Sequence, residues 1–299
     1  MAQHKINNIN IEIERHQPTG GDKKDIPLLL ISGLGSQLIV WPQSLIKSIT
    51  DCGYEVIVFD NRDAGLSDKF REFTPEMVGQ SLQQLKSGET DVDVAYTLYD
   101  MAEDVKAIID CLKLDKVHLL GCSMGGMIAQ LFAQKYNDYL ASLCIVFSTT
   151  GDPDLPEMNQ ETREKLQSPT ISDSAETVID SWAKSGVYFG SPKLGVDYDT
   201  CYEKSKKLYA RNYSPDGTIR QYLAIMATQW ETAKNKNITV PTLAICGDSD
   251  VIFSPEHSHR VAETVLNGKA VVLKDWGHDF PESICPELAK NILENIERN

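Results

Sequence analysis

The chain has 299 residues, of which 41% are hydrophobic and 24% charged, a composition typical of a soluble globular protein rather than a fibre or a disordered segment. Its length allows one large domain or two ordinary ones to bury a full core. The formal net charge of −14 argues against binding to nucleic acid or to anionic membranes, because both require a basic surface. We therefore expect neither as a partner.

The cysteines and the apolar segments favour a cytoplasmic setting. Seven cysteines are scattered along the chain without close pairs at metal-ligand spacing, which favours reduced thiols and no metal site. The N-terminal segment, residues 1–14, lacks an apolar signal region. The longest apolar stretch, residues 26–41, is interrupted by glycines and polar residues and is too short to cross a bilayer. We expect a cytoplasmic protein without a transmembrane span.

Short apolar runs alternate along the chain with amphipathic helical stretches, a pattern that predicts a mostly parallel sheet flanked by helices. Most runs are continuously apolar, as in strands buried on both faces, whereas residues 9–14 alternate between apolar and polar. The predicted strands cover residues 9–14, 27–32, 55–60, 116–121, 142–148, 241–247 and 270–274.

Capping signals mark several of the predicted helices. Thr97 and Asp100 form a Thr-x-x-Asp pattern before an amphipathic stretch, and further helices follow Gly126 and cover residues 288–296. An irregular segment, residues 69–96, carries its own signals. Its Thr74-Pro75 pair predicts the start of a helix and its Gly88 the end, while the role of the segment stays open.

The alternation of strands and helices stops at about residue 149 and resumes near residue 238. The intervening sequence opens with turns and continues as helical and polar sequence, so we divide the chain into a core (residues 1–148 and 239–299) and a helical cap (residues 149–238). An excess of aromatic residues in the cap has two explanations: a small helical insert needs a core of its own, or a lid lines an apolar pocket. These residues are Trp182, Tyr188, Phe189, Tyr198, Tyr202, Tyr209, Tyr213, Tyr222 and Trp230.

Residues 121–126 read GCSMGG and contain a Gly-x-Ser-x-Gly motif centred on Ser123. A predicted buried strand precedes the motif and a predicted helix follows it, which is the setting that a nucleophile elbow requires. The glycines two positions before and after the serine avoid collisions in this strained turn. We therefore predict that Ser123 is a nucleophile rather than a serine in an ordinary strand–helix turn.

A serine hydroxyl needs a base, and the base needs an orienting carboxylate. His278 follows the last predicted strand and is our candidate for the base, whereas we expect His257 and His259 at the surface of a helix. Asp250, in the turn after the 241–247 strand, is the candidate acid. Asp248 is the second candidate for the acid, although we expect it to shape the turn.

Acyl transfer also needs two donors for the developing oxyanion. The backbone N–H groups of Met124, directly after the serine, and Leu34, in the glycine-containing loop after the 27–32 strand, are the candidates. We reject a phosphate-binding role for that loop, because it lacks both the third glycine of a dinucleotide motif and the Lys-Ser/Thr of a P-loop.

Four segments carry a resemblance to a known family: residues 28–33 (LLLISG), 59–67 (FDNRDAGLS), 121–126 (GCSMGG) and 277–281 (GHDFP). Over nearly its whole length the chain resembles α/β-hydrolases, and within them bacterial esterases of the aclacinomycin methylesterase type. The resemblance implies an α/β-hydrolase fold in which residues 149–238 form the cap between strands six and seven. It also implies a serine hydrolase that needs no cofactor.

The chain departs from this family at two places. Many members have His-Gly where Ser32-Gly33 stands, and Asp-x-Arg-Gly where residues 60–63 read DNRD. The first departure weakens any inference about the shape of the pocket. We expect Asp60 and Arg62 to form a structural turn and an ion pair rather than to act in catalysis.

The predicted function is hydrolysis of a carboxylic ester on Ser123, His278 and Asp250, with an apolar small-molecule ester as substrate and no metal or organic cofactor. Hydrolysis of a thioester, a lactone or a carbon–carbon bond stays open, because the same triad serves all of them. Perhydrolysis is an expected side reaction. The competing class is a non-catalytic ligand-binding protein of the same fold, although such proteins commonly have a damaged triad. The sequence shows no sign of oligomeric state.

Overall fold

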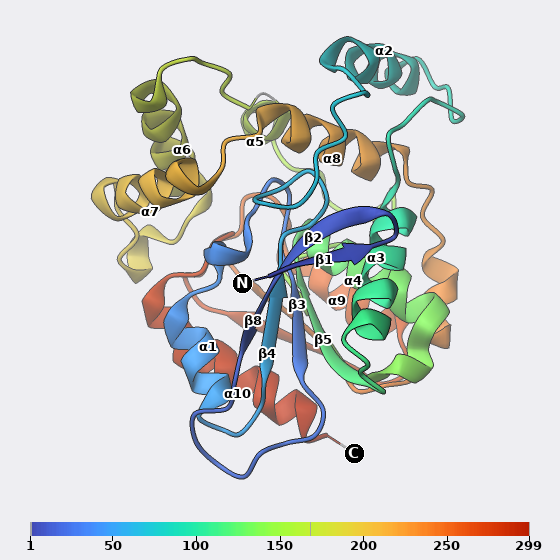
Figure 1. Cartoon of the computed structure of the whole chain (residues 1–299), viewed down its shortest axis with the longest axis vertical. Coiled ribbons are helices and arrows are strands. Elements are labelled where there is room, and N and C mark those ends of the chain that lie inside the picture. The colour runs from blue at the N-terminus through green and yellow to red at the C-terminus, as the bar shows by residue number, and fades with distance from the viewer. Residues whose placement is uncertain (1, 168, 299) are drawn as a thin grey trace.

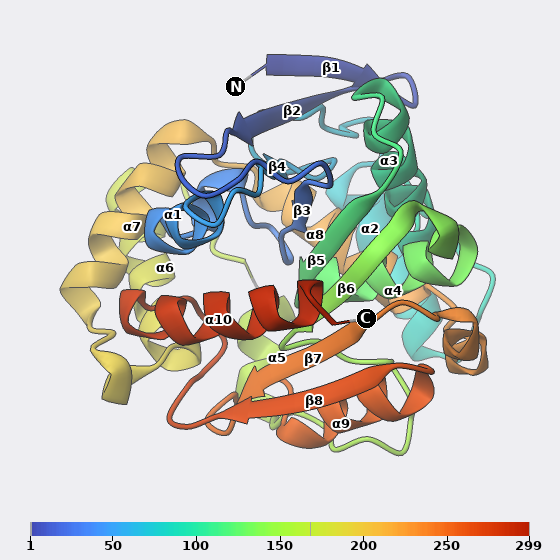
Figure 2. The same cartoon turned by 90° about the horizontal axis from the view of Figure 1, so that it is seen from below.

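The structure is a computed structural model that describes residues 2–167 and 169–298. Within these residues the strands form one sheet in the order β1-β2-β4-β3-β5-β6-β7-β8 (Figures 1 and 2). The strands are β1 (Ala2–Ile6), β2 (Ile9–His16), β3 (Leu28–Ile31), β4 (Val56–Phe59), β5 (Val117–Cys122), β6 (Leu140–Val146), β7 (Thr242–Gly247) and β8 (Gly268–Leu273).

The sheet is mostly parallel, as predicted. Strands β4, β3, β5, β6, β7 and β8 pair in parallel, and only β1 and β2 are antiparallel among the described strands. All seven predicted strands are present. The strand that the sequence analysis missed is β1, whose residues are largely exposed and polar, with Ile6 the one buried side chain. An edge strand of this kind needs little apolar sequence.

Helices cover both faces of the sheet (Figure 2). Packed clusters of apolar side chains place α3, α4 and α9 on one face and α1 and α10 on the other. The helices are α1 (Gln43–Thr50), α2 (Pro75–Lys86), α3 (Leu98–Cys111), α4 (Met124–Tyr136), α5 (Gln160–Gln167), α6 (Ala175–Phe189), α7 (Tyr198–Arg211), α8 (Pro215–Ala227), α9 (Pro255–Thr264) and α10 (Cys285–Ile296).

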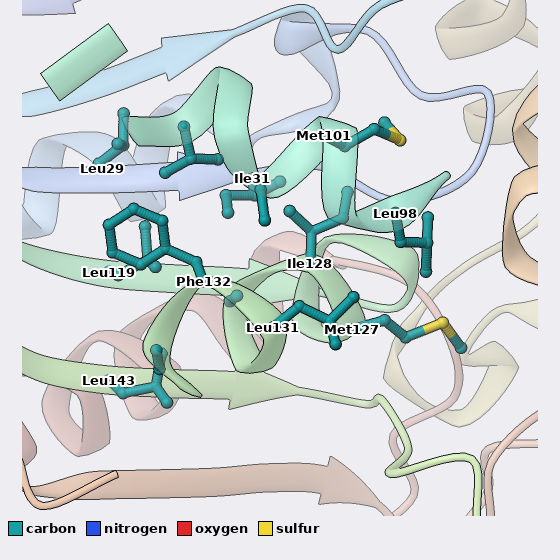
Figure 3. Packing of buried hydrophobic residues seen from close by; sticks show 14 of the residues in the cluster. Leu29, Ile31, Leu98, Met101, Leu119, Met127, Ile128, Leu131, Phe132 and Leu143 are labelled. Atoms are coloured by element: carbon teal, nitrogen blue, oxygen red, sulfur yellow. The ribbon is translucent and has the colours of Figure 1, made fainter. Parts of the chain in front are cut away.

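The predicted helix signals are confirmed. Thr97 and Asp100 form a complete capping box at the start of α3, and the Thr74 hydroxyl accepts a hydrogen bond from the Met77 N–H at the start of α2. Gly88 follows α2 with φ of 92°, the left-handed conformation that commonly ends a helix. In Figure 3, apolar side chains of α3 and α4 pack against strands β3, β5 and β6.

Between β6 and β7 the chain forms α5, α6, α7 and α8 and no strand among its described residues, so the segment expected to form the cap is helical. Helix α2 joins these cap helices, although the sequence placed its segment in the core (Figure 1). Its Val78 and the preceding Phe73 pack against Leu223 of α8 in a separate buried cluster. Segment 69–96 therefore supports the cap.

Among the helices of residues 2–167 and 169–298, none combines the length and apolar character that a bilayer crossing requires.

Candidate active site

Ser123 occupies a strained turn between β5 and α4, with φ of 52° and ψ of −123°. Residues other than glycine avoid such a conformation, at a cost of about 1–3 kcal/mol. Hydrogen bonds on both sides hold the turn. The Ser123 N–H donates to the Val146 carbonyl at 3.0 Å, and the Ser123 carbonyl accepts from the Gly126 N–H at 2.9 Å and from the Ser148 hydroxyl at 2.7 Å.

The flanking glycines are required by close backbone contacts. A Cβ atom on Gly121 would lie 2.1 Å from the Gly125 carbonyl oxygen, and one on Gly125 would lie 2.1 Å from the Ile31 carbonyl oxygen. A Cβ on Gly126 would lie 2.5 Å from the Ser148 side chain. The spacing of the motif thus follows from how tightly the turn packs against β3 and the loop after β6.

The structure brings His278 and Asp250 into contact. The His278 Nδ1 and the Asp250 Oδ2 are 2.7 Å apart, and the Asp250 side chain is fully buried. The other Asp250 oxygen accepts hydrogen bonds from the Ile252 and Phe253 N–H groups at 2.8 and 3.0 Å. With Nδ1–H donating to the carboxylate, the His278 Nε2 is left as an acceptor.

Neighbouring strand ends bring these residues to the same edge of the sheet. Ser123 follows β5, Phe147 follows β6 and Asp250 lies in the turn after β7, three strands that are adjacent in the sheet. The Phe147 ring packs against the His278 ring with centroids 4.4 Å apart. No hydrogen bond joins Ser123 Oγ to His278 within the described residues, and such contacts often form only when substrate is bound.

The two alternative residues have structural roles. Asp248 is exposed, and its Oδ1 accepts from the Asp275 N–H at 2.7 Å, so it shapes the turn as expected. The expected surface position is wrong for His257, whose side chain is buried between the Thr149 hydroxyl at 2.8 Å and the Pro156 carbonyl at 3.0 Å. Burial lowers the pKa of His257. Its partners lie about a hundred residues away in the sequence, so the periodicity of its own helix could not predict its burial. His259 is exposed, as expected.

The predicted oxyanion donors both have free N–H groups. Among the described residues, neither the backbone N–H of Leu34 nor that of Met124 has a hydrogen-bond acceptor. The Leu34 loop also lies against the nucleophile, because a Cβ on Gly33 would be 3.1 Å from the Ser123 Cβ. This proximity is compatible with one oxyanion bound between the two donors.

A cap segment holds the His278 loop. The His278 N–H donates to the Phe189 carbonyl at 2.7 Å, and the Gly277 N–H donates to the Ser191 hydroxyl at 2.8 Å. The Ser191 hydroxyl in turn donates to the Asp279 carboxylate. Burial raises the pKa of Asp279. Sequence analysis missed Ser191, since nothing in its local sequence separates it from an ordinary turn residue after a helix.

A cavity of about 200 Å³ lies between the core and the cap. Residues 34–37 of the predicted oxyanion loop form one wall, and Trp182 and Tyr213 of the cap contribute to another. The same aromatic side chains pack together, with the centroids of Trp182 and Tyr213 5.9 Å apart. Trp182 and Tyr213, two of the nine aromatic residues, therefore both pack on one another and line a cavity.

The architecture matches that of a known protein family. A family model described as the alpha/beta hydrolase fold matches residues 26–283. The chain belongs to this family. Membership confirms the α/β-hydrolase fold that the sequence predicted.

Relatives of this α/β hydrolase include two methylesterases. It is 24% identical over 296 residues to rhodomycin D methylesterase DauP of Streptomyces sp. (strain C5), with 91% of each chain covered. Its identity to rhodomycin D methylesterase DnrP of Streptomyces peucetius is also 24%, over 299 residues and 91% of each chain. These relatives confirm the predicted resemblance to methylesterases.

Solved structures share the fold. An enol-lactonase from Burkholderia xenovorans LB400 has a TM-score of 0.72 at 16% identity, with 99% of this chain and 100% of that chain covered. A thermophilic esterase from Thermogutta terrifontis has a TM-score of 0.70 at 23% identity, with 99% of both chains covered.

The structure shows the roles of Asp60 and Arg62 in the loop after β4. Asp60 is buried, accepts hydrogen bonds from the Leu38 and Leu66 N–H groups and lies 2.7 Å from Arg211 of α7. Arg62 forms a buried ion pair with Asp104 at 2.7 Å. Asp60 and Arg62 thus have structural contacts, as expected, but Asp60 pairs with Arg211 and Arg62 with Asp104 rather than the two with each other.

Proposed function

We propose that the chain is a serine esterase in which Ser123 is the nucleophile, His278 the general base and Asp250 the residue that orients His278. The single observation that carries the proposal is the strained conformation of Ser123 beside the Asp250–His278 pair at the edge of the sheet. Conformational strain of this size is retained at functional sites, where it presents a group for reaction. The methylesterase relatives support an ester as substrate.

The proposed reaction steps use the His278 Nε2 and the backbone N–H groups of Leu34 and Met124. The His278 Nε2 takes the proton of the Ser123 hydroxyl as its Oγ attacks the ester carbonyl, and the Asp250 carboxylate stabilises the imidazolium that forms. The Leu34 and Met124 N–H groups stabilise the oxyanion. His278 then gives the proton to the leaving alcohol, and a water molecule activated by His278 releases the acyl group from Ser123.

The substrate is an ester with an apolar part that enters between the core and the cap. Support comes from the cavity of about 200 Å³, whose core wall contains Leu34 and whose cap wall contains Trp182 and Tyr213. Ser123 and His278 are not among its lining residues, so the acyl chain that the site prefers is measured with an ester series rather than taken from this volume.

A cytoplasmic setting without nucleic acid partners completes the proposal. All seven cysteines are free, and two of them, Cys52 and Cys111, are exposed, which suits a reducing compartment. The acidic net charge of −14 disfavours binding to nucleic acid.

Hydrolysis of a p-nitrophenyl ester series from acetate to decanoate tests the proposal, with Ser123→Ala as the control. We expect turnover in the wild type that is lost in Ser123→Ala, and the ester that reacts fastest sizes the acyl pocket. Labelling of Ser123 by a serine-directed phosphonate separates an esterase from a non-catalytic binder. Folded wild-type protein that hydrolyses no ester would contradict the proposal, and absence of the label as well would indicate a non-catalytic binder.

A further inference from the structure

The Leu34 loop, which carries one proposed oxyanion donor, is held from outside the core by the cap helix α8. The Gln221 side chain is fully buried, and its Oε1 accepts a hydrogen bond from the Gly35 N–H at 2.7 Å. Its Nε2 donates to the Arg62 carbonyl, also at 2.7 Å. One side chain of the cap therefore joins two loops of the core, those that follow β3 and β4.

The Gly35 N–H that bonds Gln221 lies in a β-turn, and β-turns have two common forms, types I and II. The Ser36 N–H donates to the Gly33 carbonyl at 3.2 Å, so Leu34 and Gly35 are the central residues of a β-turn. Gly35 has φ of 64°, the left-handed value that a type II turn requires at its third residue. Types I and II differ by a flip of the central peptide, which contains the Gly35 N–H.

Gln221 selects one of these arrangements. In the observed turn its Oε1 faces an N–H, whereas in the flipped turn it would face the Leu34 carbonyl oxygen and both acceptors would be unsatisfied in a buried place. Thr218, one helical turn earlier in α8, packs against the same position, because a Cβ on Gly35 would lie 2.7 Å from its hydroxyl. The contact surface of α8 thus matches this one form of the loop.

We propose that Gln221 is a positioning residue for ester hydrolysis: by fixing the Leu34–Gly35 peptide it holds the whole turn in one form, and the turn in that form keeps the preceding Gly33–Leu34 peptide, which carries the Leu34 N–H, in place for the oxyanion. This inference rests on the proposed function. Gln221 acts through the loop and does not need to touch the substrate. It makes the cap a part of the catalytic geometry as well as a cover for the site.

The rate at which a phosphonate labels Ser123, followed by intact-protein mass, is the direct test. The phosphoryl oxygen gains negative charge as Ser123 attacks, so the label needs the oxyanion donors but needs no ester turnover. Gln221→Met removes both hydrogen bonds while keeping a side chain of similar size. We expect it to slow labelling and kcat by about tenfold or more, since a catalytic group displaced by about 1 Å can cost about 100-fold in rate. KM should change much less than kcat.

Two further variants separate positioning from stability. Gln221→Glu keeps an oxygen for the Gly35 N–H and loses the donor to Arg62, so it should label faster than Gln221→Met. Leu223→Ala removes a buried side chain of the same helix that packs on Phe73 and Val78 rather than on the Leu34 loop. It should lower Tm while leaving the labelling rate within about twofold of wild type.

The outcomes are distinct. Labelling of Gln221→Met at the wild-type rate, or equal slowing in Leu223→Ala, would overturn the assignment of Gln221. Wild-type protein that labels on Ser123 but hydrolyses no ester would contradict the proposed function alone, and the labelling rates would still decide the role of Gln221. Wild-type protein that does not label would overturn both.

Discussion

Arg220 of helix α8 and Asp63 of the loop after β4 form a buried, two-point ion pair that ties the cap to the core. The Arg220 Nη2 and Nε donate to the two Asp63 oxygens at 2.7 and 2.9 Å, and both side chains are almost fully buried. Asp63 has φ of 68°, a left-handed conformation that aspartate tolerates better than most residues. The hydroxyl of Tyr96 adds a third hydrogen bond to this carboxylate.

Loss of Arg220 should therefore strongly destabilise the protein. Arg220→Met leaves Asp63 charged and buried without its main partner, and we expect the free energy of unfolding in urea to fall by about 3–5 kcal/mol. Adding Asp63→Asn should recover part of the loss, because no unpaired charge then remains. Lys47→Met, which breaks the exposed pair with Asp51, serves as the control and should change stability by less than about 1 kcal/mol. An equally small effect of Arg220→Met would contradict the argument.

Asp250 is expected to matter for rate more than for binding. Asp250→Asn retains an oxygen for the Ile252 and Phe253 N–H groups, but its amide no longer holds His278 in the correct tautomer. We predict a fall in kcat on p-nitrophenyl acetate of about 10⁴-fold, the size seen when the orienting carboxylate of a serine protease is lost.

The matched control is Asp248→Asn in the same turn, which should keep kcat within a few-fold of wild type because Asp248 is exposed and contacts the Asp275 backbone. If Asp248→Asn proved the more damaging change, the assignment of the acid would be wrong.

Gly121 should not tolerate a side chain. Gly121→Ala would place a Cβ 2.1 Å from the Gly125 carbonyl oxygen, a backbone contact that has no room to relax. We predict loss of soluble folded protein, or a fall in Tm of many degrees, as measured by thermal unfolding. Gly79→Ala in α2 is the control. No atom lies within 4 Å of its added Cβ, and it should raise stability by about 0.5–1 kcal/mol through helix propensity.

His118 should make the protein less stable in acid. It lies buried on β5 beside Ser142, and burial lowers its pKa to about 4. The unfolded chain binds a proton near pH 6.5, so between about pH 6.5 and 4 unfolding takes up a proton and stability falls as pH falls, by up to about 1.4 kcal/mol per pH unit.

Urea unfolding of His118→Asn at pH 7 and pH 4.5 tests this effect, and the difference between the two pH values should be smaller than in wild type. The exposed His259 supplies the control variant His259→Asn, which should leave the difference unchanged. Burial also lowers the pKa of His257, so part of the acid sensitivity should persist in His118→Asn. If the stability of His118→Asn differed between the two pH values as much as that of the wild type, His118 would not contribute to the acid sensitivity.

Features that depend on neighbouring residues could be predicted from the sequence. The central strands followed from apolar runs, and the ends of α2 and α3 from Thr74, Gly88 and the Thr97–Asp100 pair. The elbow could be predicted because its glycines lie within two residues of Ser123. Strand β1 was missed, since an exposed edge strand carries no apolar pattern.

Features that depend on distant contacts could not be predicted in this way. The partners of Gln221 lie more than 150 residues away, and those of Ser191 more than 80. A buried glutamine or serine on a helical insert has the same local sequence whether it packs inside the cap or against the core. The burial of His257 was missed for the same reason.

The contacts of the segment from Phe189 to Ser191 with the His278 loop, and of Gln221 with Gly35, also bear on protein engineering. A chimera that received the cap of another family member would gain foreign partners for both loops along with a new pocket. Exchange of substrate preference between relatives therefore requires transplanting residues 33–37 and 275–283 together with the cap.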